Sequence, residues 1–301
     1  MTAQIDDGGD PGRFSADRSA EVVAASFSDT SDARLRTVLE SLVGHLHAFV
    51  KDVRLSPDEW QAAVRFLTET GQSCDDVRQE FILLSDVLGV SMLVESLAHD
   101  APGALTEATV EGPFHMVASP AREPGADLNV AGDPGEPCLV TGRVYDEAGT
   151  PVPGARVDVW QANADGFYDV QRPDAMPQGH LRGLFTADED GGFWFRTIVP
   201  SHYPIPTDGP VGELLRATGR HAFRPAHIHF EVSAPGLRTV TTHVFVAGSR
   251  YLDSDAVFGV KDSLVLDFAT VDDADRAAEV GLRNPFRAVD FPVVLRREEP
   301  S

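Results

Sequence analysis

Residues 224–236 read RPAHIHFEVSAPG, and this stretch carries the clearest structural signal in the chain. It predicts a β-strand over 227–232 that ends in the turn Ala234-Pro235-Gly236. Successive side chains on a strand point to opposite faces, so His227 and His229 share one face and can converge on a single ion. The alternative stays open at this point, because a His-x-His pair is often only the half-exposed face of a strand.

Two tyrosines in loop-like contexts extend this set of metal-binding candidates. Tyr168 ends DVWQANADGFY, residues 158–168, and Tyr203 lies in PSHYPIP, residues 200–206. Two imidazoles and two phenols would make a four-ligand cage, and a phenolate is a hard anionic donor that favours ferric iron. Tyrosine is also a common core residue of β-sandwiches, so the alternative reading is structural.

The rest of the chain predicts helices first and short strands afterwards. Apolar residues recur at helical spacing from Leu35 to Val50, and Ser56-Pro57-Asp58-Glu59 is a capping box that starts a second helix. Further helical segments are expected from Asp76 through Leu84 and after Gly89. Besides 227–232, strands are expected at 139–145, 155–160, 193–198, 240–246, 263–268 and 293–296.

Many short strands joined by turns predict a mainly β protein with a β-sandwich domain. We expect three segments along the chain. Residues 1–30 are a flexible N-terminal segment, 31–118 a helical domain with its linker, and 119–301 the β-sandwich domain.

Composition limits the partners. The net charge is −22, from 47 acidic and 25 basic residues, which would repel nucleic acid and anionic membrane surfaces. The apolar stretches are too short to span a membrane, and the acidic N-terminus is unlike a secretory signal. Cys74 and Cys138, the only cysteines, fall in different predicted domains, which fits a reducing compartment. We therefore expect a cytoplasmic protein with no nucleic-acid or membrane partner.

The order Tyr168, Tyr203, Arg224, His227, His229, within DVWQANADGFYD, VPSHYPIP and RPAHIHFEVSAPG, resembles the intradiol ring-cleaving dioxygenases of the catechol 1,2-dioxygenase group. The resemblance implies one non-haem Fe(III) per subunit, bound by the two tyrosines and two histidines. It also implies a small aromatic diol or triol and O2 as substrates, a proton-accepting role for Tyr203 and a catalytic β-sandwich. Arg224 would stabilise negative charge that develops on the ring, although a plain ion pair with a carboxylate is its alternative role.

Three stretches are similar to the hydroxyquinol branch of this family: residues 80–92, 241–245 and 251–261. In TTHVF, residues 241–245, His243 stands where the catechol branch usually has glutamine, and we count it among the catalytic residues. Asp86 would accept a hydrogen bond from a third substrate hydroxyl, although a solvated or helix-capping role is equally compatible with its chemistry. On this resemblance the pocket is lined by Leu83, Asp86, Val110, Gly112, Pro113, Phe114, Val199, Pro200 and Val257.

Several alternatives remain. Glu111 before Gly112 and Pro113 matches the catechol branch, so catechol or chlorocatechol is the alternative substrate. The resemblance further implies a homodimer through the N-terminal helices with a channel that can hold a lipid, whereas the apolar helix faces could instead cover one another and the sandwich. A non-catalytic β-sandwich binding module and a zinc hydrolase that uses His227 and His229 are the two remaining function classes.

Overall fold

The computed structural model describes residues 13–75, 78–99, 105–115 and 119–298. The chain divides into two compact units, Met1–Thr68 and Glu69–Ser301. The predicted domain boundaries at 30 and 118 therefore stay predictions.

The first unit is helical. It contains α1 (Ser19–Ala25), α2 (Ala33–Val53) and most of α3 (Pro57–Gln72). The Asp32 side chain caps α2 by accepting the N–H groups of its first turn. At α3 the predicted capping box is present: the Ser56 N–H donates to the Glu59 carboxylate at 2.8 Å, and the Glu59 N–H donates to the Ser56 hydroxyl at 3.3 Å.

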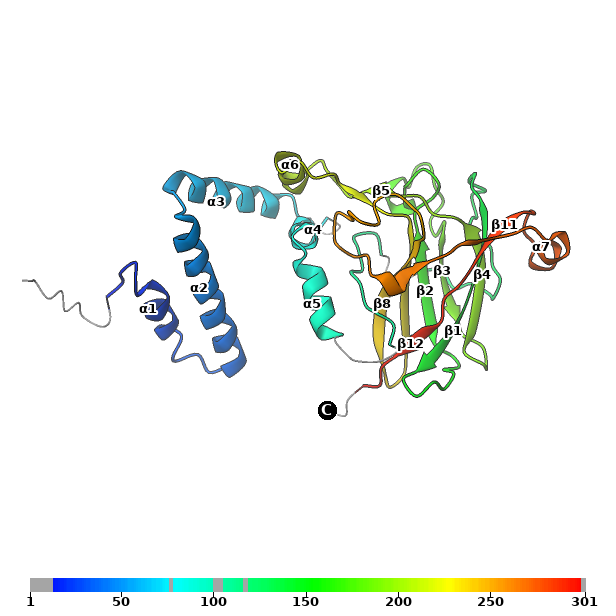
Figure 1. Cartoon of the computed structure of the whole chain (residues 1–301), viewed down its shortest axis with the longest axis horizontal. Coiled ribbons are helices and arrows are strands. Elements are labelled where there is room, and N and C mark those ends of the chain that lie inside the picture. Colours follow the sequence, from blue (N-terminus) through cyan, green and yellow to red (C-terminus); the bar gives the residue numbers. More distant parts are fainter. Residues whose placement is uncertain (1–12, 76–77, 100–104, 116–118, 299–301) are drawn as a thin grey trace, which may run out of the picture. The chain divides into compact units, whose positions relative to one another are not determined.

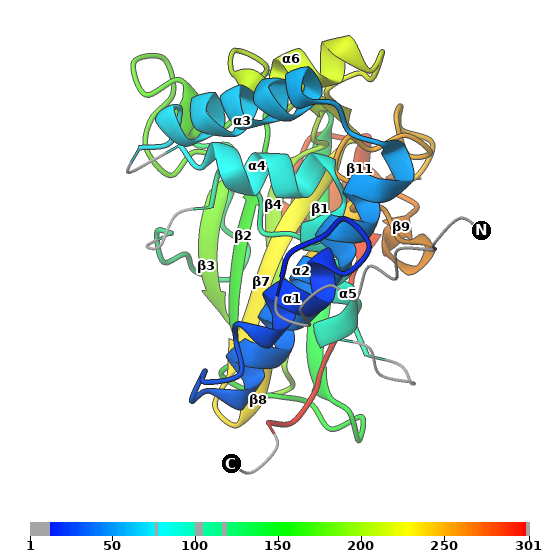
Figure 2. The same cartoon turned by 90° about the vertical axis from the view of Figure 1, so that its left-hand side faces the viewer.

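Helix α1 lies within the stretch that was expected to be loosely ordered, and it was not predicted. It packs against α2 (Figure 2), and the Lys51 ammonium of α2 donates to the Asp17 carbonyl at 3.3 Å. Contacts with α2 therefore stabilise α1, although the sequence of this segment shows no helical periodicity of apolar residues.

The second unit begins with α4 (Glu80–Val87) and α5 (Val90–Ala98), as the sequence indicated, and continues into two five-stranded sheets (Figure 1). The first two residues of the third predicted helical segment, Asp76 and Val77, lie outside the described residues, and the helix begins only at Glu80. In the first sheet β1 is central: it pairs with β4, β11 and β12, and β10 follows β11 at the edge. Its strands are β1 (Pro137–Asp146), β4 (Gly192–Ile198), β10 (Ala269–Val271), β11 (Phe286–Asp290) and β12 (Val293–Leu295).

The second sheet has the order β3-β2-β7-β8-β9. Its strands are β2 (Arg156–Gln161), β3 (Arg182–Thr186), β7 (His227–Ala234), β8 (Leu237–Val246) and β9 (Val265–Leu266). Two further short strands, β5 (Tyr203–Pro204) and β6 (Phe223–Arg224), pair with each other in a separate ribbon. In the sequence, α6 (Pro210–Ala217) lies between these two strands. The predicted β-sandwich is confirmed.

One apolar core joins the two sheets. It contains Val140 and Phe195 from the first sheet and Val159 and Phe230 from the second, all with 0% exposure. Because side chains alternate along β7, placing Phe230 in the core turns His229 to the outer face of the second sheet. The fold thus decides where the histidine pair can act.

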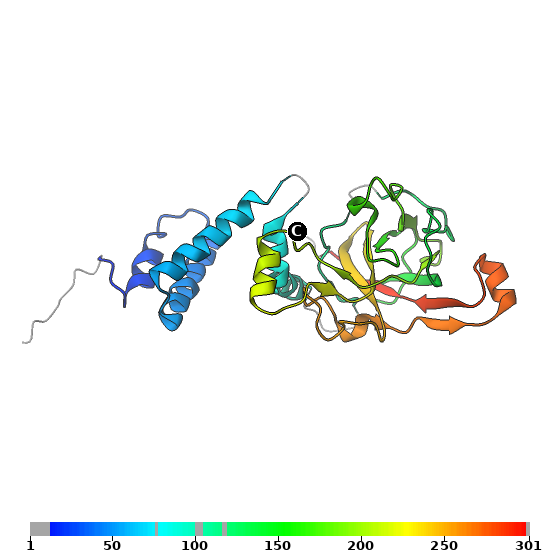
Figure 3. The ribbon, with the colours of Figure 1, turned by 90° about the horizontal axis from the view of Figure 1, so that it is seen from above.

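Further regions differ from the sequence-based expectation, and strand β3 and helix α6 are among the elements that were not predicted. Over 263–268 a 3₁₀ turn, η2 (Asp262–Leu264), precedes a strand of only two residues, and Leu264 and Phe268 enter the core from a largely irregular segment. The strand predicted there is therefore mostly wrong. Strands β10 and β11, and the helix α7 (Ala274–Val280) that joins them beyond the end of the sheets (Figure 3), were not predicted.

Within the described ranges, no single helix is long and apolar enough to cross a membrane. Helices α4 and α5 meet the length and composition criteria only as a pair, and they bend by 78° between them.

Candidate metal centre and active site

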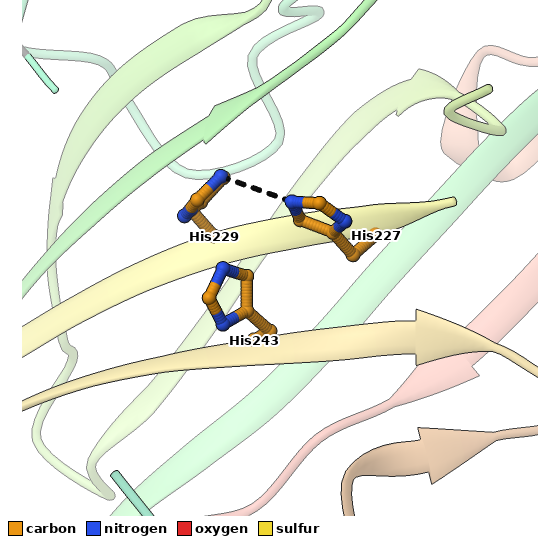
Figure 4. A group of neighbouring side chains, drawn as sticks. All are labelled: His227, His229 and His243. Atoms are coloured by element: carbon orange, nitrogen blue, oxygen red, sulfur yellow. Dashed lines mark hydrogen bonds between the residues drawn. The ribbon is translucent and has the colours of Figure 1, made fainter. Parts of the chain in front are cut away.

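Three histidines from adjacent strands meet on the outer face of the second sheet (Figure 4). His229 of β7 stands directly opposite His243 of β8 in the strand register. The Nε2 atoms of His227 and His229 are 3.1 Å apart, and the His243 ring centroid lies 4.2 Å from that of His229. All three are buried, so water has little access to the point where their ring nitrogens converge.

Both predicted tyrosines join this cluster. The Tyr168 hydroxyl is 3.1 Å from His229 Nε2, and the ring centroid of Tyr203 lies 5.1 Å from that of Tyr168 and 5.4 Å from that of His227. Tyr168 stands just before the 3₁₀ turn η1 (Asp169–Gln171), where its N–H donates to the Gln171 side chain at 2.9 Å. The structure thus brings together all four side chains that the sequence proposed as metal ligands.

The protonation of the histidines suits metal binding. His227 Nδ1 lies 2.7 Å from the Pro225 carbonyl, which can only accept, so Nδ1 carries the proton and Nε2 is left with a lone pair. Burial lowers the pKa of His227 well below its ordinary value, and the nearby Arg224 charge adds to this effect. Burial and the neighbouring histidines lower the pKa of His229 in the same direction. Both imidazoles are therefore neutral at pH 7, the form in which they could bind a metal.

Burial opposes the ionisation of Tyr168, one of the four candidate ligands. Its burial, with a further contribution from Tyr203, raises the pKa of the phenol well above its ordinary value. A buried phenolate needs a nearby positive charge, since desolvation penalises the charged form. A cation of high charge at the point where the four side chains meet would supply it, and the donor set fits such an ion.

His243 is the third imidazole of the cluster. Its Nδ1 contacts the Thr109 hydroxyl, and its Nε2 is buried without a hydrogen-bond partner among the described residues. The ring nitrogens of the three histidines that could bind one ion all lie within 4.8 Å of one another. The residue that was singled out from the TTHVF string therefore stands at the site.

Arg224 reaches the site from β6, which pairs with β5 through Tyr203, and not from β7. Its Nη1 lies 3.5 Å from the Tyr203 hydroxyl, and its Nε lies 3.2 Å from Asp255 Oδ1. Burial alone would lower the pKa of Arg224, but the Asp255 carboxylate and both phenols outweigh it and hold that pKa above its ordinary value. A permanent positive charge thus adjoins the four candidate ligands.

One wall of the site comes from residues 110–114 and from β2. Phe114 stacks on Tyr168 with ring centroids 4.7 Å apart, and Trp160 stacks on His229 at 4.6 Å. Gly112 has a φ of +78°, and a Cβ at this position would lie 3.2 Å from His229 Cε1, so a glycine is needed there. The neighbouring Pro113 is exposed.

The remaining pocket candidates are placed as follows. Asp86 of α4 is buried, burial raises the pKa of its carboxyl, and its Oδ1 has no hydrogen-bond partner among the described residues. Val257 is buried and donates its N–H to Asp255 at 3.3 Å. Val199 packs against the sandwich core. Leu83, Val110 and Pro200 are buried. The roles of these residues in substrate binding stay predictions.

Sequence reasoning did not single out three residues that complete the site. They are Asp255, which binds Arg224; Thr109, which contacts His243; and Trp160, which covers His229. Asp255 lies 31 residues from Arg224 in the chain. Its string YLDSDAVFGVK was noticed only as a branch signature, and nothing in that string distinguishes Asp255 from the exposed Asp253.

Comparisons with known proteins agree with this geometry. The profile described as "Dioxygenase" matches residues 110–297, and the profile described as "Catechol dioxygenase N terminus" matches residues 32–106. The chain belongs to the intradiol ring-cleaving dioxygenases. The family predicted from the tyrosine and histidine motifs is thereby confirmed.

Relatives from two branches differ in their distance from this dioxygenase. It is 51% identical over 290 residues to a hydroxyquinol 1,2-dioxygenase of Rhizobium sp., across 96% of this chain and 98% of the relative. The crystal structure of a hydroxyquinol 1,2-dioxygenase from Pseudomonas putida superposes with a TM-score of 0.86 at 46% identity, covering 94% and 99% of the two chains. A catechol 1,2-dioxygenase of Candida albicans is 36% identical over 85% of each chain. The predicted resemblance to the hydroxyquinol branch is confirmed.

Proposed function

We propose that this dioxygenase opens hydroxyquinol, 1,2,4-trihydroxybenzene, between its two adjacent hydroxyls with O2. The product would be 3-hydroxy-cis,cis-muconate, which tautomerises to maleylacetate. The observation that carries the proposal is the convergence of Tyr168, Tyr203, His227 and His229 on one buried point beside Arg224. The 51% identity to a hydroxyquinol 1,2-dioxygenase supports the choice of substrate.

The proposed cofactor is one non-haem Fe(III) per subunit, bound by the two tyrosines and two histidines. Held by Tyr168, Tyr203, His227 and His229, the iron(III) would supply the Lewis-acid and redox chemistry that makes a bound diol reactive to O2. Phenolate donors support this assignment over zinc, since they favour an ion of high charge. A zinc hydrolase at the same histidines would be colourless and would contain zinc.

Tyr203 and Arg224 have separate roles in this proposal. Tyr203, whose phenol oxygen lies 3.5 Å from Arg224 Nη1, would as its phenolate accept a substrate proton when the diol binds and so become the neutral phenol. Arg224 would then stabilise the negative charge that develops on the ring, because its guanidinium is always protonated and donates from a fixed plane. His243 would lie beside the substrate, where its Nε2, which has no hydrogen-bond partner among the described residues, can hydrogen-bond to a substrate oxygen.

We propose that Asp86 accepts a hydrogen bond from the third hydroxyl of the substrate. Its buried Oδ1 lacks a partner among the described residues, and a site built to hydrogen-bond a substrate hydroxyl discriminates strongly against an analogue without it. The pocket residues proposed to surround the ring are Leu83, Val110, Gly112, Pro113, Phe114, Val199, Pro200 and Val257.

Steady-state oxygen uptake with hydroxyquinol and catechol tests the substrate. We expect the wild-type protein to show a higher kcat/KM for hydroxyquinol. Asp86→Ala should narrow this preference, chiefly through slower hydroxyquinol turnover. A higher kcat/KM for catechol in the wild-type protein would overturn the assignment in favour of a catechol 1,2-dioxygenase. No uptake with either substrate would favour a non-catalytic binding module.

We also propose a homodimer formed through the N-terminal helices, with room for a bound lipid, in the cytoplasm. Helix α2 supports the dimer, because it has no buried residue and exposes an apolar series that a soluble monomer would normally cover. The two free cysteines, Cys74 and Cys138, are compatible with a reducing compartment. Sedimentation measurements decide between dimer and monomer. The exposed series comprises Leu35, Val38, Leu42, Leu46, Phe49, Val50 and Val53.

A further inference from the structure

Arg224 is held by a buried carboxylate on one edge of its guanidinium. Its Nε lies 3.2 Å from Asp255 Oδ1 and its Nη2 lies 3.4 Å from Asp255 Oδ2. Both side chains are only 2% exposed. A carboxylate that meets two nitrogens of the planar fork fixes its orientation as well as its position. Only the Nη1 edge is left to point elsewhere, and it faces the Tyr203 hydroxyl at 3.5 Å.

The same carboxylate also organises the loop around it. Asp255 Oδ2 accepts the Gly259 N–H at 2.9 Å, and Oδ1 accepts the Val257 N–H at 3.3 Å. Each carboxylate oxygen thus binds one backbone N–H and one guanidinium nitrogen. A Cβ at position 259 would lie 2.9 Å from Arg224 Nη2, so the loop backbone approaches the arginine closely at a glycine.

The loop is held in an unfavourable backbone conformation at both ends. Tyr251 and Phe258 have φ angles of 69° and 60°, a region that costs free energy for residues with a Cβ. Tyr251 stacks on Phe223 with ring centroids 4.9 Å apart, and the Ala256 N–H donates to the Phe223 carbonyl at 3.2 Å. Since Phe223 precedes Arg224 in β6, these contacts attach the loop to the strand that carries the arginine.

We propose that Asp255 is a positioning residue for the reaction: it directs the Nη1 edge of Arg224 toward Tyr203 and the substrate. The same bonds place Val257 of the proposed pocket wall. The role rests on the proposed function, because it acts only through Arg224. A purely structural ion pair would have the same distances, so the two roles must be separated by the kinetics of variants.

Asp255→Asn is the primary variant, because it keeps the size of the side chain and removes its charge. We expect kcat for hydroxyquinol to fall roughly 10–100-fold, the usual cost of losing a partner that orients an active-site group, with KM little changed. Iron content and the visible spectrum should stay at wild-type levels. Asp253→Asn is the matched control, since Asp253 is exposed in the same loop, and it should keep wild-type kcat.

A double-mutant cycle gives the decisive comparison. If Asp255 acts only through Arg224, then Arg224→Ala and the double variant Arg224→Ala, Asp255→Asn should have the same kcat, since the effects of residues that act as a unit are not additive. A kcat in the double variant clearly below that of Arg224→Ala would overturn the positioning role.

This comparison also holds if Asp255→Asn alone does not fold. A buried charge without its partner is strongly destabilising, whereas removing both partners is milder. Arg224→Ala leaves the buried Asp255 carboxylate unpaired, so the double variant should be more stable than Arg224→Ala. Wild-type kcat in a folded Asp255→Asn variant would overturn the inference and leave the proposed function intact. Absence of turnover in the wild-type protein would instead overturn the proposed function.

Discussion

Strand β7 carries buried side chains on both of its faces, but those on one face are apolar and those on the other are histidines. On one face Ile228, Phe230 and Val232 enter the core between the two sheets. On the other, His227 and His229 are equally inaccessible, although they are polar and titratable. Burying an apolar side chain stabilises a fold by about 1.5–3 kcal/mol. Burying an imidazole without a partner costs free energy.

The comparison explains where chemistry can occur on this scaffold. The core face needs nothing further, because its packing is favourable by itself. The outer face holds neutral histidines and a phenol whose raised pKa opposes ionisation, and these become favourable together only around a cation. Buried polar groups that a bound ion would stabilise mark a candidate functional site. Substitutions on the outer face should therefore reduce bound iron and turnover, whereas substitutions on the core face should reduce the free energy of unfolding.

The largest effect is expected on the outer face. Tyr168→Phe removes one phenolate donor from the proposed set, so bound iron should fall well below one per subunit and turnover should fall by more than about 100-fold, beyond the usual cost of losing an indirect partner. The folded state should persist. Metal analysis and oxygen uptake measure both quantities.

Tyr145→Phe is the matched control for this variant. It makes the same chemical change at a tyrosine of β1, away from the site, and should keep both iron and turnover. Full iron content in Tyr168→Phe would remove Tyr168 from the ligand set.

A substitution on the core face should lower the stability of the fold and leave iron binding unchanged. Phe230→Ala empties a fully buried position next to His229, and we expect the free energy of unfolding to fall by about 3–5 kcal/mol. The iron content of the folded fraction should stay near that of the wild type. Denaturant unfolding and metal analysis of the same sample test this. Loss of iron without loss of stability would contradict the division between the two faces.

The pH dependence of the iron-free protein separates two kinds of histidine. Burial lowers the pKa of His227, His229 and His243 below 6.5, so the unfolded chain binds more protons and stability should fall as pH drops below about 6.5. The carboxylates of Asp158 and Glu111 raise the pKa of His115 to about 9. Its contribution is therefore complete below about pH 6.5 and is lost as pH rises through 9.

Denaturant unfolding between about pH 5 and 10 should give a stability maximum between these limits. In His115→Gln the alkaline decline should become smaller while the acid decline stays. An unchanged alkaline decline in this variant would show that His115 has no part in it.

The sequence was most informative where a pattern is local. The spacing from Leu35 to Val50 predicted α2, the capping box at Ser56 predicted the start of α3, and the alternation around His227 predicted β7. Each of these signals follows from the geometry of a single helix or strand. Of the four proposed ligands, the histidine pair came from strand alternation and the tyrosines from their donor chemistry, and the structure brings all four together.

Features that depend on distant partners were missed. Asp255 looks like any surface acid until the fold places it beside Arg224. The apolar stretch 263–268 resembles a strand, but it pairs with β8 only at Val265 and Leu266 and otherwise fills the core. Helix α1 depends on α2 in the same way. Tertiary contacts override local pattern in all three cases.

The visible absorption spectrum tests the central claim most directly. The purified protein, kept free of O2, is measured before and after hydroxyquinol is added. Phenolate bound to Fe(III) should give a red to burgundy colour through ligand-to-metal charge transfer, and the band should shift when the substrate binds. A colourless protein, or a band that hydroxyquinol leaves unchanged, would contradict the proposed centre of Tyr168, Tyr203, His227 and His229.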